Sequence, residues 1–153
     1  RREAAKKYQK EMEEKYKVPV MVCDSVEEAV KGAEIICTVT PSKEPYLKAE
    51  WIAPGAHINA VGAFTPNTRE IESRLMAKAK LYADQVEAMK KECGEYLIPK
   101  DEGLFGVEHI TGSIGGILAG TVPGRENDTE ITLFDALGLA VEDVACGRFL
   151  CRE

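Results

Sequence analysis

The pattern of hydrophobic and polar positions predicts helices alternating with short strands. Between residues 2 and 17, apolar side chains recur every three or four positions among charged ones, which is the period of a helix with one buried stripe. Apolar, β-rich runs predict strands at residues 19–23, 34–39, 57–61 and 81–83. Capping residues and glycines predict helices at residues 25–32, 68–79 and 84–94, with a helical turn near residue 51. This order indicates a mostly parallel sheet covered on both faces.

The alternation of predicted strands and helices stops after residue 95. Residues 96–106 are loop-rich, 113–119 predict a short Gly-rich helix, and 121–129 form a polar region with Pro and Gly. Residues 131–134 then predict a strand, and 139–151 predict an amphipathic helix whose buried face includes Val141, Val144, Ala145 and Phe149. We therefore expect a boundary between a first unit at residues 1–120 and a C-terminal segment at residues 121–153.

Composition narrows the class of protein. The chain has 153 residues, 44% hydrophobic and 30% charged, which suffices for one domain with a core. Its 20 basic and 26 acidic residues give a net charge of −6, which disfavours nucleic acid and anionic lipid as partners. No apolar run approaches the roughly 20 residues of a membrane span, and the charged start lacks a signal peptide's apolar segment. We expect a cytoplasmic protein with no membrane partner.

The thiols and histidines indicate no metal centre. The five cysteines form no C-x-x-C pair, and His57 and His109 stand far apart in the sequence. We interpret the cysteines as reduced packing thiols. Asp84 and Asp143 are interpreted as a helix cap and a solvated helix residue, so the sequence nominates no catalytic group.

The candidate site lies at the carboxyl ends of the strands, where loops of an open α/β sheet bind ligands. The informative ends combine hydroxyls with small residues, at Thr40, Ser42, Gly62 and Ala63. A flat ligand such as a nucleotide could lie against this backbone, although the same residues also suit simple strand-terminating turns. No glycine-rich phosphate turn is present. Residues 112–116 lack the G-x-G-x-x-G spacing, so we expect them to let a helix pack closely.

Five stretches of the sequence carry a family likeness. They are SVEEAVKGAEIICTVTPSKEP at 25–45, WIAPGAHINAVGA at 51–63, TREIESRLM at 68–76, AGTVPGR at 119–125 and EITLFDALGLAVEDVA at 130–145. They span nearly the whole chain, and the HINAVGA and ITLF-x-x-x-G-x-A-x-x-D elements are specific. In these stretches the sequence resembles the ornithine cyclodeaminase/mu-crystallin family of NAD(P)-dependent enzymes.

The resemblance implies an α/β fold with a partial Rossmann-like, doubly wound parallel sheet. It places residue 1 just after the second Rossmann strand, so we expect a fragment without the first two strands, the phosphate turn and most of the N-terminal half. Residues 1–120 would be a truncated NAD(P)-binding domain, and residues 121–153 would return to the substrate and dimerisation domain. The strand at 19–23 would either pair with 34–39 or stay unpaired, which would leave the isolated piece marginal or rearranged.

The resemblance also implies where NAD or NADP would bind. The adenosine and ribose would lie against Thr38, Val39 and Thr40, and the nicotinamide near Val61, Gly62 and Ala63. The turn at 134–138, which includes Leu137 and Gly138, would close over the nicotinamide. Arg1 and Arg2 lie where a cation could meet the 2′-phosphate of NADP, or they are simply solvated. Catalytic residues would belong to the N-terminal half.

Phe64 departs from the family members that cyclise ornithine, which carry an aspartate at this position. A phenylalanine cannot handle protons or an amine. It therefore favours hydride transfer to or from a cyclic imine, as in a ketimine reductase, or an L-amino acid. The alternatives are ornithine cyclodeaminase, a lyase that forms proline and ammonia, and a non-catalytic crystallin-like protein that binds NADP. The expected partners are a small amino acid or cyclic imine and, for the parent protein, a second subunit of a homodimer; the fragment alone would be inactive.

Overall fold

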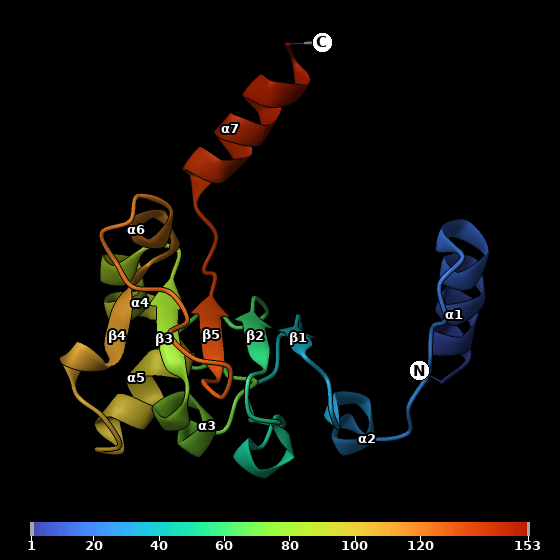
Figure 1. The fold of residues 1–153 in the computed structure, drawn as a ribbon, viewed down its shortest axis with the longest axis horizontal. Coiled ribbons are helices and arrows are strands. Elements are labelled where there is room, and N and C mark those ends of the chain that lie inside the picture. The colour runs from blue at the N-terminus through green and yellow to red at the C-terminus, as the bar shows by residue number, and fades with distance from the viewer. Residues whose placement is uncertain (1, 153) are drawn as a thin grey trace.

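The computed structural model describes residues 2–152 and contains a five-stranded sheet in the order β1-β2-β5-β3-β4 (Figure 1). All four neighbouring pairs of strands run parallel. The strands are β1 Ile35–Thr38, β2 His57–Ala60, β3 Lys80–Ala83, β4 Ile110–Ser113 and β5 Thr132–Asp135. The expected α/β class with a parallel sheet is confirmed.

Three helices pack against one face of the sheet. They are α3 Ser73–Lys78, α4 Val86–Glu92 and α5 Gly94–Asp101. Ile58, Leu81 and Leu133 come from three adjacent strands, and the solvent reaches none of them. Burying each such side chain stabilises the fold by about 1.5–3 kcal/mol. The prediction of a loop at residues 96–106 is wrong over its first half, which belongs to α5. Pro99 lies inside this helix, and a proline normally indicates that a helix ends.

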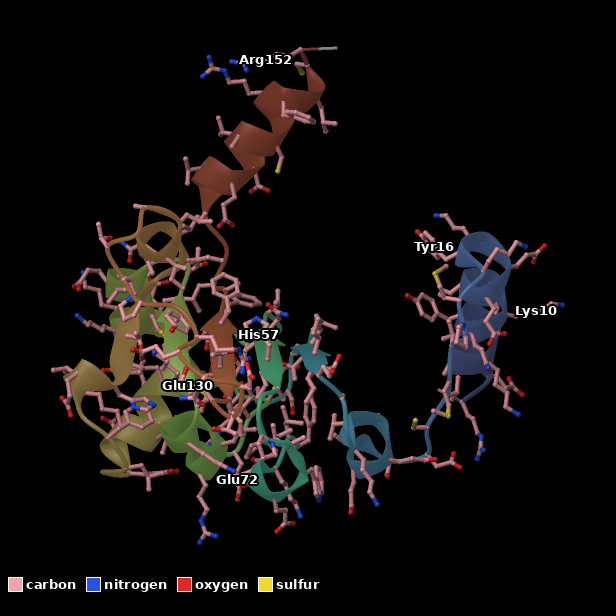
Figure 2. The ribbon with its side chains drawn as sticks, viewed as in Figure 1. Lys10, Tyr16, His57, Glu72, Glu130 and Arg152 are labelled. Atoms are coloured by element: carbon pink, nitrogen blue, oxygen red, sulfur yellow. The ribbon has the colours of Figure 1, made fainter. Side chains whose placement is uncertain are left out.

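The opposite face of the sheet carries both polar side chains, such as His57, Asn59 and Thr132, and apolar ones, such as Ile35 and Phe134. Helix α6, Ile114–Leu118, lies over this face beside a hollow of about 460 Å³ that includes His57, Phe134 and Arg125. Thr132 Oγ1 accepts a hydrogen bond from Arg125 Nη2 at 2.9 Å and lies 2.8 Å from His57 Nδ1. His57 is labelled in Figure 2 and belongs to β2, which lies between β1 and β5.

Strand β5 occupies the centre of the sheet, paired with β2 on one side and β3 on the other. It comes from the segment at residues 121–153, so that segment completes the sheet. Its assignment to a second domain stays a prediction. Strand β4 was not foreseen, because its sequence ITGS has few β-favouring residues, and it follows a short helical turn η2 at Val107–His109.

The N-terminal segment forms α1 Arg2–Tyr16 and α2 Val26–Val30 without a strand between them. The strand predicted at residues 19–23 is therefore wrong, as expected for a segment without a partner strand. The backbone of Val20 instead pairs with α1, where Gln9 Nε2 donates to its carbonyl at 2.6 Å and Glu13 Oε1 accepts from its amide at 3.1 Å. The predicted buried stripe of α1 is also wrong, because no residue of this helix is buried.

Helix α7, Ala140–Leu150, projects away from the sheet at the C-terminal end (Figure 1). The face predicted to be buried is exposed, with 66% of Val141, 68% of Val144 and 70% of Phe149 accessible to solvent. In Figure 2, Tyr16 on α1 and Arg152 beyond α7 also lie away from the sheet. Within residues 2–152, no helix is both long enough and apolar enough to cross a membrane.

The segment before α3 is extended rather than helical. The helix predicted at residues 68–79 begins only at Ser73, because Ile71 forms a parallel bridge with Leu47. The amides of Tyr46 and Leu47 both donate to the carbonyl of Glu70, at 2.8 and 2.9 Å. The expected helical turn is present as η1, Ala49–Trp51.

Candidate functional site

The carboxyl ends of the five strands form one row across the sheet. Thr38 pairs with Ala60, Ala60 with Asp135, Asp135 with Ala83, and Ala83 with Ser113. The loops that follow β1, β2 and β5 therefore lie side by side. This register brings the predicted residues 38–40, 61–63 and 137–138 to one edge.

The loops after β1 and β2 are in direct contact. The amides of Val61 and Gly62 both donate to the carbonyl of Thr38, at 3.0 and 3.2 Å. A Cβ at Gly62 would collide with the amide nitrogen and carbonyl oxygen of Thr40. Only glycine allows this approach, so the two loops form one continuous surface, which we call the strand-end floor, at residues 38–40 and 61–63.

The strand-end floor exposes apolar side chains around a buried base. Thr38 and Ala63 are buried, whereas Val39 is 68% exposed and Val61 is 45% exposed. Phe64, next to the floor, is 59% exposed. A hollow of about 700 Å³ adjoins the floor at the end of β1, and its lining comprises Val26, Val39, Thr40, Pro41, Ser42 and Tyr46. The site can therefore accept a flat, partly apolar ligand.

The loop after β5 is tied to the same edge by Asp84. Asp84 Oδ2 accepts from the amides of Leu137 and Gly138 at 2.8 and 2.9 Å, and the amide of Ala136 donates to Ala60 O at 2.9 Å. The interpretation of Asp84 as a helix cap is wrong, because Gln85 caps α4 through its side chain. Asp84 instead orders the predicted closing turn. Gly138 adopts a φ of +87°, which favours glycine there.

Glu70 is a site residue that the sequence did not reveal. It is fully buried, and its carboxylate accepts hydrogen bonds from Thr40 N at 2.5 Å, Tyr46 OH at 2.6 Å and Gly62 N at 3.1 Å. It therefore lies beneath both loops of the strand-end floor. The available signal was its place in TREIESRLM, one of the stretches that carry the resemblance.

Glu95 on α5 supports Glu70 from below. The amides of Glu70 and Ile71 donate to its carboxylate, and the side chain is fully buried. Burial raises the pKa of Glu95 to about 8, although the hydrogen bond from the Glu70 amide acts in the opposite direction. The contact explains why residues 70–71 cannot begin α3.

Asp135 and Cys93 form a second buried polar pair under the edge. Cys93 Sγ donates to Asp135 Oδ2 at 3.2 Å, and Asp135 is 1% exposed. Burial raises the pKa of Asp135 to about 7; the hydrogen bond from Cys93 opposes this shift, and the charges of Asp84 and Glu70 reinforce it. Burial and the nearby Asp135 carboxylate also raise the pKa of the Cys93 thiol, which leaves it a poor nucleophile.

The other candidates from the sequence have structural roles. Gly116 packs against Val122, as expected for a helix that packs closely, and Ser113 Oγ caps α6 by accepting from the Gly116 amide at 3.1 Å. Arg2 pairs with Asp24 through the two terminal guanidinium nitrogens, Nη1 at 2.9 Å and Nη2 at 3.2 Å. Arg1 lies outside the described residues.

The thiols only partly follow the prediction. All five cysteines are free, and Cys93 is a buried packing thiol as expected. Cys37, Cys146 and Cys151 are exposed, so the packing interpretation is wrong for them. Among residues 2–152, no cluster of three His, Cys, Asp or Glu side chains could hold a metal ion.

The parallel sheet, with loops joined at its carboxyl ends, places this chain in the doubly wound class of α/β domains. Comparison with known proteins then identifies its family. The chain belongs to the ornithine cyclodeaminase/mu-crystallin family, whose sequence profile matches residues 1–152. The resemblance seen in the five stretches is confirmed.

Three similar proteins illustrate the relationship. The ketimine reductase mu-crystallin of Mus musculus is 45% identical over 131 residues, covering 86% of this chain and 39% of that protein. The structure of Thermococcus litoralis Δ1-pyrroline-2-carboxylate reductase in complex with NADH and L-proline has a TM-score of 0.92 at 37% identity, covering 97% of this chain and 46% of that one. An archaeal alanine dehydrogenase dimer with bound NAD has a TM-score of 0.88 at 40% identity, covering 97% of this chain and 45% of that one. The chain thus spans less than half the length of these relatives.

Proposed function

We propose that this chain is the NAD(P)-binding part of an oxidoreductase that transfers hydride to or from a cyclic imine or an L-amino acid. The observation that carries the proposal is the strand-end floor, where Gly62 lies against Thr40 and a hollow opens beside Val39 and Thr40. The relatives named above are a ketimine reductase, a pyrroline-2-carboxylate reductase with NADH, and an alanine dehydrogenase with NAD. The strand-end floor supports the position of the cofactor, and the relatives support its chemistry.

The floor residues fit a dinucleotide in the order that the resemblance implies. In this proposal the adenosine and ribose lie against Thr38, Val39 and Thr40, beside the hollow at the end of β1. The nicotinamide lies over Val61, Gly62 and Ala63, and the turn with Leu137 and Gly138 closes over it. A bound reduced cofactor would supply the hydride to an imine, or a bound oxidised cofactor would accept it from an amino acid, and the protein would orient the cofactor and exclude water.

Phe64 supports an imine or amino acid as the substrate rather than ornithine cyclisation. Its ring is exposed beside the proposed nicotinamide position, where it offers an apolar contact and no proton carrier. We expect the whole protein to act as a homodimer, because one structural neighbour is a dimer with bound NAD. The segment at residues 121–153 would return to the second domain through α7. The five free cysteines suit a cytoplasmic enzyme.

Fluorescence titration of the whole protein with NADH and NADPH tests this proposal. Binding followed by oxidation of the cofactor on addition of piperideine-2-carboxylate would support the reductase. Binding without oxidation would leave ornithine cyclodeaminase and a non-catalytic binding protein as the alternatives. NAD-dependent formation of proline from ornithine would overturn the argument from Phe64.

A further inference from the structure

The buried Glu70 carboxylate connects two loops that are far apart in sequence. Oε1 accepts from the amide of Thr40 at 2.5 Å, and Oε2 accepts from the amide of Gly62 at 3.1 Å. Each loop thus binds a different oxygen of one rigid, planar group. The distance between the two amides is set by the width of that carboxylate.

The carboxylate is itself held in place from several sides. Tyr46 OH donates to Oε1 at 2.6 Å, and the Tyr46 amide donates to the carbonyl of Glu70 at 2.8 Å. The amide of Glu70 donates to Glu95 on α5. These contacts leave Glu70 little freedom to follow a movement of either loop, so the loops must conform to it.

The absence of a side chain at Gly62 gives independent support for this spacing. A Cβ there would come within 2.7 Å of Glu70 Oε2 and would also collide with Thr40. The loops therefore approach each other to the limit that backbone atoms allow. A small increase in their separation would break the continuous surface of the floor.

We propose that Glu70 is the positioning residue of the strand-end floor, fixing the separation of the loops after β1 and β2 and thereby the shape of the surface that holds the dinucleotide. This inference rests on the proposed function. Glu70 is buried beneath the floor, so a molecule bound on the floor would not touch it. It acts through the backbone of Thr40 and Gly62, which lies between it and the bound molecule.

The hydrogen-bond pattern requires a carboxylate at this position. All three partners of Glu70 are donors, so both oxygens must accept. A glutamine has the same shape but would turn one NH₂ group toward an amide that also donates. That buried donor would be left without an acceptor, and the loop that faces it would move away.

The test compares three variants of the whole protein: Glu70→Gln, Tyr46→Phe and the matched control Glu72→Gln. Glu72 lies two residues away and accepts from the amide of Ala49 at 2.9 Å, away from the floor. The readouts are the KM of the reduced dinucleotide that the wild type binds, NADH or NADPH, the kcat at saturating cofactor, and the melting temperature.

We expect Glu70→Gln to raise the cofactor KM by about tenfold while kcat at saturation stays within about twofold, because loss of a buried hydrogen bond weakens binding by that order. Tyr46→Phe removes one of the three donors and should raise KM by about threefold. Glu72→Gln should leave KM unchanged. If Glu70→Gln fails to fold, the cofactor KM of Tyr46→Phe tests the inference: a rise of about threefold supports it, and an unchanged KM contradicts it.

Two results would overturn the inference. One is a cofactor KM unchanged in both Glu70→Gln and Tyr46→Phe; the other is an equal rise in Glu72→Gln, which would indicate a general loss of structure. If the wild type binds neither NADH nor NADPH, the proposed function fails and this inference fails with it. If the wild type binds the dinucleotide and Glu70→Gln and Tyr46→Phe bind it equally well, the inference about Glu70 fails but the proposed function stands.

Discussion

At the residue scale, the strand-end floor depends on one glycine. A side chain at Gly62 would meet Thr40 and Glu70 in a space without room for it. We expect Gly62→Ala to destabilise the protein by about 1–3 kcal/mol and to weaken dinucleotide binding at least tenfold, because the loops would have to separate. Urea denaturation and NADH titration measure both effects. Gly147→Ala in the exposed helix α7 is the control, since an added Cβ would meet no atom within 4 Å beyond its chain neighbours and the backbone of its own helix. Equal effects of the two changes would contradict this account.

Two buried carboxyls give the fold a pH dependence. The pKa of Asp135 is about 7 and that of Glu95 about 8 in the folded protein, both above their ordinary values. Between about pH 4 and pH 8, the unfolded chain therefore releases protons that the folded protein retains, and the free energy of unfolding falls as the pH rises. Above about pH 8, where both carboxyls are ionised in the folded protein as well, this loss of stability is complete.

The substitution Asp135→Asn separates this effect from other titrations. It should reduce the loss of stability between about pH 5 and pH 8 by on the order of 1 kcal/mol, since the asparagine amide that replaces the carboxyl does not ionise. Urea denaturation at the two pH values measures the loss. Asp143→Asn on the exposed helix α7 should follow the wild type. The same pH dependence in Asp135→Asn and wild type would show that Asp135 is not buried as described.

At the scale of elements, strand β5 makes the C-terminal segment part of the sheet. Leu133 lies between β2 and β3 and is fully buried, so Leu133→Ala should destabilise the fold by about 2–5 kcal/mol. Phe149→Ala on α7, where the ring is 70% exposed, should change stability by less than about 0.5 kcal/mol. Chemical denaturation compares the two. Comparable losses would mean that β5 does not occupy the centre of the sheet.

Elements with a strong local signal could be predicted from the sequence. The apolar runs of β1, β2, β3 and β5 identified four strands, because buried parallel strands are nearly continuous in hydrophobic residues. β4 and α5 lack such a signal. β4 forms by pairing with β3 at the edge of the sheet, and α5 has Gly94, Glu95, Tyr96 and Pro99 buried against its neighbours. The parallel topology indicated the strand ends with Thr40, Ser42, Gly62 and Ala63, whereas the roles of residues 38–40, 61–63 and 137–138 came from the family resemblance. Neither revealed Glu70, because its role depends on loops at residues 40 and 62 that meet only in three dimensions.

At the scale of the whole molecule, α1 and α7 have no buried residues, although both carry apolar side chains. The proposed second domain would cover α7. In hydrogen exchange, we expect the amides of α7 to exchange rapidly in the 153-residue chain and to be protected in the whole protein, because packing suppresses local unfolding. The amides of β5 should be protected in both. Rapid exchange of α7 in the whole protein would argue against its place in a second domain.

The central claim is that the strand-end floor holds a nicotinamide dinucleotide. Amide chemical-shift mapping of the isotope-labelled whole protein during titration with NADH or NADPH tests it most directly. We predict saturable chemical-shift changes at the amides of Thr40, Gly62 and Gly138. The amide of His57, on the face of the sheet that α6 covers, should not change. Shifts confined to other surfaces, or none with either dinucleotide, would contradict the account.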